Sequence, residues 1–310
     1  LVFTFSKDLV TESKLNQWDS VQYIKFEPAI KGRFKWTSSN ELIFSPLSGF
    51  SPATDYTAKI NSLLLNVIDK ENKLDLSTKA IHFHTPYLTL ASTEAWWGIS
   101  KETAKNELKV RLRFNYPISK KDLAERLKVF SKEKNLDYRM LSSGNDTDVD
   151  IAIINQLATS KEQIPITIKI DKGLKTTIAA FKTPTEISKI VDAPSPLHLE
   201  VLDIQTGFEN NGGFVKVVTS HELQESEILK AITLDPDLTK QIDKIDNGFI
   251  IRADFNEVDT YHLGLNTSLR SMIGPHLEET RTKDLFFGKM PSSIAFTNKK
   301  ALYMTSKGAQ

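Results

Sequence analysis

The chain has 310 residues, of which 40% are hydrophobic and 25% charged, a composition typical of folded globular proteins and not of disordered ones. Its 40 basic and 39 acidic residues nearly cancel, so no basic field is available to attract a nucleic-acid partner. The absence of cysteine excludes disulfides, cysteine nucleophiles and thiolate metal sites, and no apolar run approaches the ~20 residues that span a bilayer.

Segments of alternating apolar and polar residues recur along the chain, and this two-residue period predicts β-strands with one buried and one solvent-facing side. The clearest is Lys109–Phe114, where apolar side chains alternate strictly with basic ones. The other strands expected, in chain order, are Val2–Phe5, Leu42–Phe44, Tyr56–Asn61, Ile166–Asp171 and Tyr261–Asn266. The β-branched content of these segments also favours a pleated conformation over a helix.

Three short segments have helical spacing of their apolar residues, at 11–18, 119–130 and 222–231. In the middle segment Ser119 is placed to cap the helix, with Asp122 three residues further on. We expect each segment to be a crossover of one or two turns that joins strands of a sandwich, because such short helices are not stable alone.

One motif occurs three times at intervals of about one hundred residues, which is the size of an independent β-sandwich. Phe83-His84-Thr85-Pro86 recurs as Phe181-Lys182-Thr183-Pro184, and a looser copy follows at Phe286–Pro291. The sequence therefore predicts a mainly β chain of tandem Ig-like antiparallel β-sandwiches, each with a short crossover helix. We expect the motif to mark the last strand of each sandwich and the exit toward the next.

Proline interrupts strand pairing and keeps the preceding residue extended, so we expect module boundaries just after the Thr-Pro dipeptides. This predicts Ig-like modules at 1–86, 87–186 and 187–291, followed at 292–310 by the start of a further domain. The second and third modules open with an additional strand, whereas the first begins at the next one, Val2–Phe5. We therefore expect the first module to be without its first strand, and the chain to belong to a longer protein.

Three groups of residues have features of metal or catalytic sites, and each has a simpler interpretation. His221-Glu222-Leu223-Gln224-Glu225 lacks the second histidine of a zinc-protease helix, and its place in the repeat predicts a solvated turn. His82 and His84 could share a strand face, but the second copy has Lys182, which cannot replace a neutral imidazole ligand. The acidic segment Asn145–Asp150 lacks the glycine and glutamate of an EF-hand loop, so an acidic turn leading into a strand at Val149–Ile153 is expected, with adventitious calcium as the alternative. The sequence thus offers no catalytic, metal or cofactor residue, and we expect a protein that is not an enzyme.

Trp96 and Trp97 are the one pair that suggests ligand binding. Consecutive strand residues face opposite sides, so one ring is expected in the core and the other near the surface. An exposed ring could stack on a sugar or cover a neighbouring domain; we expect packing at a contact between modules, with glycan binding as the alternative. Trp18 and Trp36 are expected in the core of the first module.

The first module also carries a family resemblance, in the segments Pro28–Gly32, Trp36, Glu41–Pro46 and Phe50–Tyr56. It resembles the bacterial Ig-like modules in which a Pro-x-x-x-Gly segment and a tryptophan strand precede a Leu-x-Pro-x-Thr-x-Tyr corner, here with Phe50 in place of leucine. Pro52 and Thr54 set the turn, and Tyr56 can return its hydroxyl to the backbone as a tyrosine corner. The middle copy departs from the pattern, with Gln163–Ile166 in place of the corner.

Such modules in series, ending in Phe287–Phe296, resemble the N-terminal region of bacterial α2-macroglobulin-like proteins. The resemblance implies a non-catalytic scaffold of an endopeptidase inhibitor that traps proteases. Its partners would be downstream macroglobulin domains of the same protein and, through them, proteases. It also implies a periplasmic or cell-envelope location, with any lipid anchor outside this chain, and the absence of cysteine excludes the family's thioester from this segment. The alternative is a cell-surface adhesin or glycan-binding protein of tandem Ig-like modules.

Overall fold

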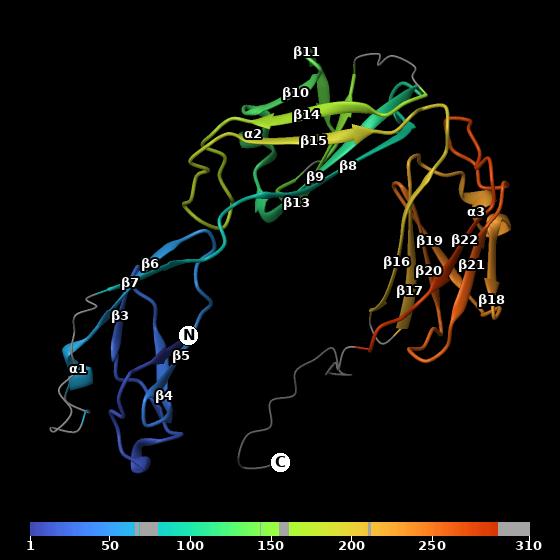
Figure 1. Ribbon diagram of the computed structural model, residues 1–310. Coiled ribbons are helices and arrows are strands. Elements are labelled where there is room, and N and C mark those ends of the chain that lie inside the picture. The colour runs from blue at the N-terminus through green and yellow to red at the C-terminus, as the bar shows by residue number, and fades with distance from the viewer. Residues whose placement is uncertain (66–67, 69–79, 143, 155–160, 210–211, 291–310) are drawn as a thin grey trace, which may run out of the picture. The chain divides into compact units, whose positions relative to one another are not determined.

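The computed structural model of the chain describes residues 1–310 except 66–67, 69–79, 143, 155–160, 210–211 and 291–310 (Figure 1). The expected start of a further domain at 292–310 therefore lies outside the described residues. The chain divides into two compact units: unit 1 is Leu1–Glu94, Arg111–Ala152 and Ile166–Val191, and unit 2 is Ala95–Val110, Ile153–Pro165 and Asp192–Gln310. The module boundaries expected above stay predictions.

The first pair of sheets belongs to unit 1 and has the strand orders β1-β5-β4-β2 and β3-β6-β7 (Figure 1). The elements are β1 (Val2–Thr4), η1 (a 3-10 turn, Glu12–Lys14), β2 (Trp18–Asp19), β3 (Ile24–Glu27), β4 (Gly32–Ser38), β5 (Glu41–Pro46), β6 (Asp55–Ile60), α1 (Ser62–Leu65) and β7 (Ile81–His84). All of these pairings are antiparallel. Phe26 of one sheet contacts Phe44 of the other, with ring centroids 4.6 Å apart, so a shared aromatic core joins the two sheets.

The second pair of sheets has the orders β12-β13-β9-β8 and β11-β10-β14-β15. The elements are β8 (Leu90–Ile99), β9 (Asn106–Ile118), α2 (Lys120–Ala124), β10 (Leu127–Ser131), β11 (Lys134–Leu136), β12 (Tyr138–Met140), β13 (Asp146–Ile153), β14 (Ile164–Ile170) and β15 (Ile187–Ala193). The alternation read from Lys109–Phe114 is confirmed, because Val110, Leu112 and Phe114 are buried while the basic side chains between them reach solvent.

The third pair of sheets belongs to unit 2 and has the orders β16-β17-β20-β19 and β18-β21-β22. The elements are β16 (Val201–Glu209), β17 (Gly212–Thr219), α3 (Glu225–Ala231), β18 (Ile232–Asp235), β19 (Gln241–Ile245), β20 (Gly248–Ala253), β21 (Tyr261–Leu265) and β22 (Arg281–Leu285). Val217, Phe249 and Leu263 are among the fully buried side chains of its core. The chain is therefore mainly β and built of tandem Ig-like antiparallel sandwiches with short crossover helices, as the sequence predicts.

The helical segments are shorter than their sequence spacing suggests. The hydroxyl of Ser119 accepts a hydrogen bond from the Asp122 amide (3.5 Å), as expected, but α2 ends at Ala124. Leu127 and Val129 instead alternate on β10, which pairs with β14, so the helix expected at 119–130 is confirmed only in its first half. A two-residue period that pairs with a neighbouring strand outweighs the weak propensity of so short a helix.

Trp18 and Trp36 differ, and only the second prediction is confirmed. Trp36 is 3% exposed in the core, whereas Trp18 lies on the edge strand β2 and is 50% exposed. The ammonium of Lys35 lies 5.1 Å from the centre of the Trp18 ring, a cation–π contact that suits a ring half in water.

The threonine of the repeated motif holds the loop that precedes it. Thr85 donates its hydroxyl to the Ser51 carbonyl (2.8 Å) and accepts the Thr54 amide (2.9 Å). Thr183 accepts the amides of Gly173 and Leu174, both at 3.0 Å. The first copy ends strand β7, but the second lies in a loop with one isolated bridge to Lys175, and β15 follows it in the same sheet as β14. The expectation that every copy of the motif marks a last strand is therefore wrong for the second copy. There, as in the first copy, the threonine hydroxyl still fixes the preceding loop.

The tyrosine corner is confirmed and occurs twice. The hydroxyl of Tyr56 accepts the Ser51 amide (2.9 Å), and that of Tyr261 accepts the Asn256 amide (3.2 Å), each from five residues before it. Ile166 stands at this place in the middle copy and has no hydroxyl to offer.

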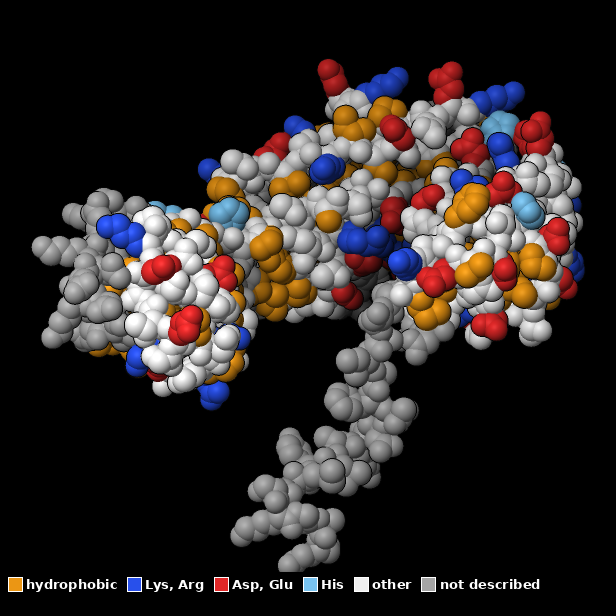
Figure 2. Space-filling view, turned by 60° about the horizontal axis from the view of Figure 1, so that its bottom comes forward, with side chains coloured by type: hydrophobic (Ala, Val, Ile, Leu, Met, Phe, Trp, Pro, Cys, Tyr) orange, Lys and Arg blue, Asp and Glu red, His pale blue; other side chains and the backbone are white. Residues whose placement is uncertain are grey.

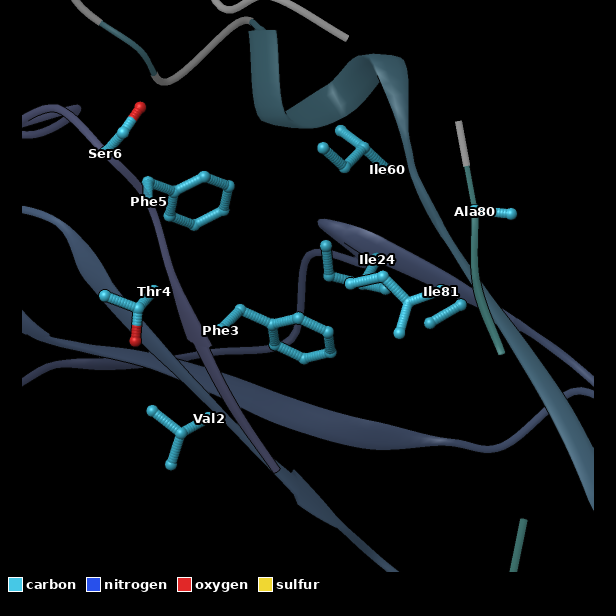
Figure 3. A pocket seen from close by; sticks show the side chains of 10 residues that line it. Val2, Phe3, Thr4, Phe5, Ser6, Ile24, Ile60, Ala80 and Ile81 are labelled. Carbon is cyan, nitrogen blue, oxygen red and sulfur yellow. The ribbon is translucent and has the colours of Figure 1, made fainter. Parts of the chain in front are cut away.

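The strand pairing of β1 separates the first pair of sheets from the other two. Among the described strands, β9 lies between β13 and β8, and β17 lies between β20 and β16, whereas β1 pairs with β5 alone. Beside β1 is a cavity of about 430 Å³, which we call the β1 groove. Its lining residues, most of them labelled in Figure 3, are Val2, Phe3, Thr4, Phe5, Ser6, Ile24, Ala58, Ile60, Ala80 and Ile81.

Candidate functional site

Strand β8 brings the two tryptophans singled out by the sequence into the interior. Trp96 is 1% exposed and Trp97 is 7% exposed, and the flanking residues Ala95 and Gly98 are of low exposure too. Both faces of the strand end are thus covered. The expectation that one ring lies near the surface is wrong, because a second layer of chain packs over the face that a single sandwich would leave open.

That second layer comes from residues 194–222, and Trp97 binds it with three polar groups. Its amide donates to the Ser220 carbonyl (3.0 Å), and its own carbonyl accepts the Glu222 amide (2.7 Å), which forms a parallel bridge with His221. The indole Nε1 donates to the Pro194 carbonyl (2.8 Å). All of these residues belong to unit 2. We call this set of bonds the Trp97 contact.

His221 lies at the centre of the Trp97 contact and is fully buried. Its Nε2 lies 2.9 Å from the Ser195 carbonyl, which can only accept, so this nitrogen carries the proton and Nδ1 is left without a hydrogen-bond partner. Burial, with the nearby His198 charge adding to it, lowers the pKa of His221, although its bond to the Ser195 carbonyl acts in the opposite direction. The ring is therefore neutral at pH 7. The solvated turn expected at 221–225 is wrong, because His221 and Leu223 are both fully buried.

A half-buried charge cluster flanks the contact. Glu222 receives the ammonium of Lys109 at 3.3 Å and that of Lys244 at 3.5 Å. A Cβ on Gly98 would lie only 2.7 Å from the Glu222 carboxylate, so the absence of a side chain there lets the carboxylate approach the strand. Ion pairs of this kind add little net stability, but breaking one leaves a partly desolvated charge, so the cluster favours one register of the two segments.

The remaining candidates from the sequence have structural partners. In the strand that follows Asn145, Asp150 binds Arg111 through two bonds of 2.8 Å, and Asp148 binds Arg113 at 3.1 Å. These arginines bind the carboxylates of the expected acidic turn. The strand expected at Val149–Ile153 is present as β13, but it already begins at Asp146. Across the described ranges, no group of three potential ligand side chains could hold a metal ion.

The histidine pair on β7 is engaged locally. His82 Nδ1 lies 3.0 Å from the Thr57 hydroxyl, and His84 Nδ1 lies 2.9 Å from the Thr85 carbonyl. The His84 ring stacks on Tyr87 at 4.2 Å, and Tyr87 stacks on Phe181 at 5.0 Å, all within unit 1. We call this the Tyr87 stack; it brings together the first two copies of the repeated motif.

On the face shown in Figure 2, acidic and basic side chains are interspersed with hydrophobic ones. Of the helices that the structure describes, none is long and apolar enough to cross a membrane.

Comparison with known proteins finds three bacterial proteins of similar sequence, all named as alpha-2-macroglobulins or homologs. The chain is 28% identical over 221 residues to an alpha-2-macroglobulin of Pasteurella multocida, which covers 67% of this chain and 11% of that protein. It is 23% identical over 229 residues to an alpha-2-macroglobulin homolog of Yersinia pestis, covering 68% of this chain and 11% of that protein. The chain is similar to these bacterial alpha-2-macroglobulins over about two thirds of its length.

A third relative, an alpha-2-macroglobulin of Rickettsia conorii, is 26% identical over 156 residues, covering 49% of this chain and 8% of that protein. The chain thus spans about a tenth of the length of the alpha-2-macroglobulins it matches. No family model matches the sequence. Among solved structures, the three-Ig ectodomain of mouse nectin-like molecule 4 aligns with 89% of this chain and 84% of its own, at 7% identity and a TM-score of 0.22.

Proposed function

We propose that this chain is a non-catalytic scaffold segment of a bacterial alpha-2-macroglobulin-like endopeptidase inhibitor. The observation that carries the proposal is the Trp97 contact. Three side chains that could take part in binding or catalysis, Trp97, His221 and Glu222, instead join one part of unit 2 to another. Their contacts leave no open face of these side chains for a substrate. A buried network of this kind suits a segment whose task is to hold other domains in position.

The Tyr87 stack supports the same role within unit 1. Its three rings lie nearly parallel, with interplanar angles of 4° and 14°. The Tyr87 hydroxyl also donates to the carboxylate of Asp55, the first residue of β6. Aromatic contacts of this kind stiffen the passage from the first to the second copy of the motif, because stacked rings resist bending of the chain between them.

The partners and location of the longer protein are part of the proposal. Relatives that carry the name alpha-2-macroglobulin support a protein that inhibits endopeptidases by trapping them. We propose that downstream macroglobulin domains are the direct partners of this chain and that proteases are partners of the whole protein. A periplasmic or cell-envelope location, with a lipid anchor outside these residues, completes the proposal.

The alternative of a glycan-binding adhesin has no support from the tryptophans. Stacking on a sugar needs an accessible ring face, and both rings of the pair are buried. Affinity electrophoresis through polysaccharide gels tests this alternative, and we expect equal mobility for the chain and its Trp97→Ala variant. Retardation that disappears on substitution would favour the adhesin.

The scaffold role is tested in the longer protein by a trapping assay. A trapped protease is closed off from casein but still cleaves a small peptide substrate, so the ratio of the two activities measures trapping. We expect Trp97→Ala to reduce protection of the protease by several-fold, because displaced modules misplace the domains they carry. Trp18→Ala is the matched control, since it removes an exposed ring and should leave trapping unchanged.

The isolated 310-residue chain supplies the second arm of the test. We expect it neither to inhibit nor to cleave any protein substrate at tenfold molar excess over the protease. Inhibition by the isolated chain would contradict the scaffold role. Loss of the Trp97 contact is detected as loss of protection of the β8 amides from hydrogen exchange. If Trp97→Ala shows that loss but trapping is unchanged, the scaffold role is contradicted as well.

A further inference from the structure

A shallow pocket lies on the outer face of the first sandwich, which the first pair of sheets forms. Its volume is about 230 Å³, and it is lined by Trp18, Arg33, Ser45, Pro46 and Leu47. Two of these side chains, Trp18 and Leu47, are large apolar residues that stay mostly in water. We call this the Trp18 pocket. Its lining combines an aromatic ring, apolar carbon, a cation and a hydroxyl, which is the mixture found in sites for small polar ligands.

Strand β2 holds the Trp18 ring in place at the edge of the sheet. Trp18 pairs with Lys35 on β4. The next residue, Asp19, accepts the Val21 amide (2.8 Å) and the hydroxyl of Tyr23, whose ring is buried in the core. Because half of Trp18 is in water, packing of the core does not account for a tryptophan at this position. A ring fixed in this way loses little freedom when a ligand binds.

The cations beside the ring have no carboxylate partner. Arg33 and Lys35 alternate with buried residues on β4, so both face outward with Trp18. Neither forms an ion pair within the part of the chain that the structure describes. Lys35 lies 5.1 Å from the centre of the Trp18 ring but does not line the pocket, so the part of the ring that does is free of it. Ser45 stands directly opposite Arg33 on β5, and its hydroxyl has no hydrogen bond to another described residue.

The four-stranded sheets of the other two sandwiches neutralise their outward arginines. Arg111 of β9 binds Asp150 on the neighbouring strand through two bonds of 2.8 Å. Arg252 of β20 binds Asp243 on its neighbouring strand at 2.8 Å. In the first sandwich the residue opposite the outward arginine is a serine. An arginine that is free to bind an anion, beside an exposed tryptophan, thus distinguishes the first sandwich from the other two.

We infer that the Trp18 pocket binds a carboxylate-bearing sugar unit of an acidic saccharide. The C–H face of the sugar ring would stack on the indole, whose π face is negative, and the carboxylate would accept two hydrogen bonds from the Arg33 guanidinium. A sugar hydroxyl would bond to Ser45. The pocket suits a single ring, because its volume lies below the roughly 300 Å³ at which pockets for larger ligands begin. The inference is independent of the scaffold role, and its site is separate from the buried pair Trp96 and Trp97.

Two other anionic occupants fit the Trp18 pocket less well. An added peptide strand needs a run of free backbone groups, whereas β2 has only two residues. A membrane surface is bound by several apolar side chains that project together, whereas this pocket is concave and contains a cation and a hydroxyl. The experiment below includes a probe for each of them.

Trigalacturonate is the probe, and its uncharged methyl ester is the matched control ligand. Each is titrated into the ¹⁵N-labelled 310-residue chain, and the indole N–H signals of the four tryptophans are followed by NMR. The Trp18 signal, assigned from its absence in Trp18→Ala, should shift saturably, while those of buried Trp96 and Trp97 should stay in place. We expect the methyl ester to bind at least about tenfold more weakly, because it offers Arg33 no charge.

Two variants of the chain test the Trp18 pocket itself. Arg33→Gln should weaken binding of trigalacturonate at least about tenfold, whereas Lys25→Gln, which removes the same charge from an exposed position on β3, should not. Trp18→Ala should abolish binding, and Phe286→Ala, which removes an exposed ring from the third sandwich, should bind like the parent chain. Because Arg33 is exposed, its variant folds even if Trp18→Ala does not. Trapping by the longer protein should be unchanged in Arg33→Gln, which separates this inference from the scaffold role.

Three results would overturn the inference. The first is absence of a saturable shift up to millimolar trigalacturonate. The second is equal affinity of Arg33→Gln and Lys25→Gln for trigalacturonate. The third is binding of triglutamate, or of phosphatidylglycerol vesicles, that is at least as tight as that of trigalacturonate and is lost in Trp18→Ala. An acidic peptide or a lipid surface would then be the occupant.

Discussion

The first and third sandwiches share their corner and differ at one edge. Both have a tyrosine whose hydroxyl binds the amide five residues before it, and both surround it with aromatic rings, Phe50 and Phe83 in one and Phe255 and Phe287 in the other. In the third, β17 lies between two strands, while in the first, β1 has one neighbour and a groove beside it. Both of these sheets have four strands, so the corner specifies the turn between strands but not which edge of the sheet carries the additional strand.

The difference has an energetic consequence. A strand with neighbours on both sides buries its inward side chains fully, and Val215 and Val217 are 0% exposed. The corresponding side chains of β1, Phe3 and Phe5, are both only partly buried, and both line the β1 groove. We therefore expect equal substitutions to cost less in the first sandwich than in the third.

The largest expected difference comes from removing a core ring. Phe249→Ala in β20 should lower the free energy of unfolding of the third sandwich by about 3–5 kcal/mol, because it leaves a cavity in a closed core. Phe3→Ala should cost the first sandwich about 1–2 kcal/mol, since its ring already borders open space. Native-state hydrogen exchange of the β20 and β5 amides measures the two separately. Equal losses would contradict the comparison.

Proline tests the strand edges next. Lys216→Pro in β17 removes one ladder bond and leaves a carbonyl of a neighbouring strand unpaired, so it should cost about 1–3 kcal/mol. Thr4→Pro in β1 should cost less than about 0.5 kcal/mol, because its amide points away from β5. Denaturant unfolding of the two variants, each against the parent chain, checks the prediction. A larger loss for Thr4→Pro would show that the outer edge of β1 is paired.

A pH dependence distinguishes the two sandwiches by their histidines. Burial lowers the pKa of His221 below its ordinary value of 6.5, so the unfolded chain binds a proton that the folded chain excludes. Stability from this group is therefore present above pH 6.5 and falls as the pH drops below it, by at most about 1.4 kcal/mol per unit. His221→Gln should flatten the dependence seen in thermal unfolding between pH 7.5 and 5.5. His82→Gln, at an exposed residue of β7, is the control and should leave it unchanged.

The smallest expected effect concerns the shared corner. Tyr56→Phe and Tyr261→Phe each remove one hydrogen bond to an amide and keep the ring, so each should cost about 1 kcal/mol. Because the two corners have the same geometry, we expect the two losses to agree within about 0.5 kcal/mol. Loss in only one sandwich would mean that the corners are not equivalent.

Much of the fold could be predicted because its signals are local. The alternation at Val110, Leu112 and Phe114 predicts their burial, and the spacing of Pro52, Thr54 and Tyr56 predicts the corner. The Ser119 cap is likewise encoded within a few residues. The extent of α2 is not, because pairing of Leu127 and Val129 with β14 decides where the helix ends.

The Trp97 contact could not be derived from the sequence, since its partners lie far along the chain. The bond from Trp97 to Pro194 spans 97 residues, and the ion pair of Lys109 with Glu222 spans 113. Comparison between repeats also misled at His221, because its full burial depends on a distant partner, the Ser195 carbonyl. Gly98 gave no signal of its own, although its lack of a side chain admits the Glu222 carboxylate.

The open edge of β1 is the point on which the comparison depends, and amide hydrogen exchange in one ¹⁵N-labelled sample tests it most directly. We predict that Lys216 and Val217 of β17 are both protected, because that strand is bonded on two sides. In β1 we predict protection of Phe3, whose amide faces β5, and rapid exchange of Thr4, whose amide faces outward. A Thr4 amide as slow to exchange as that of Phe3 would contradict the account.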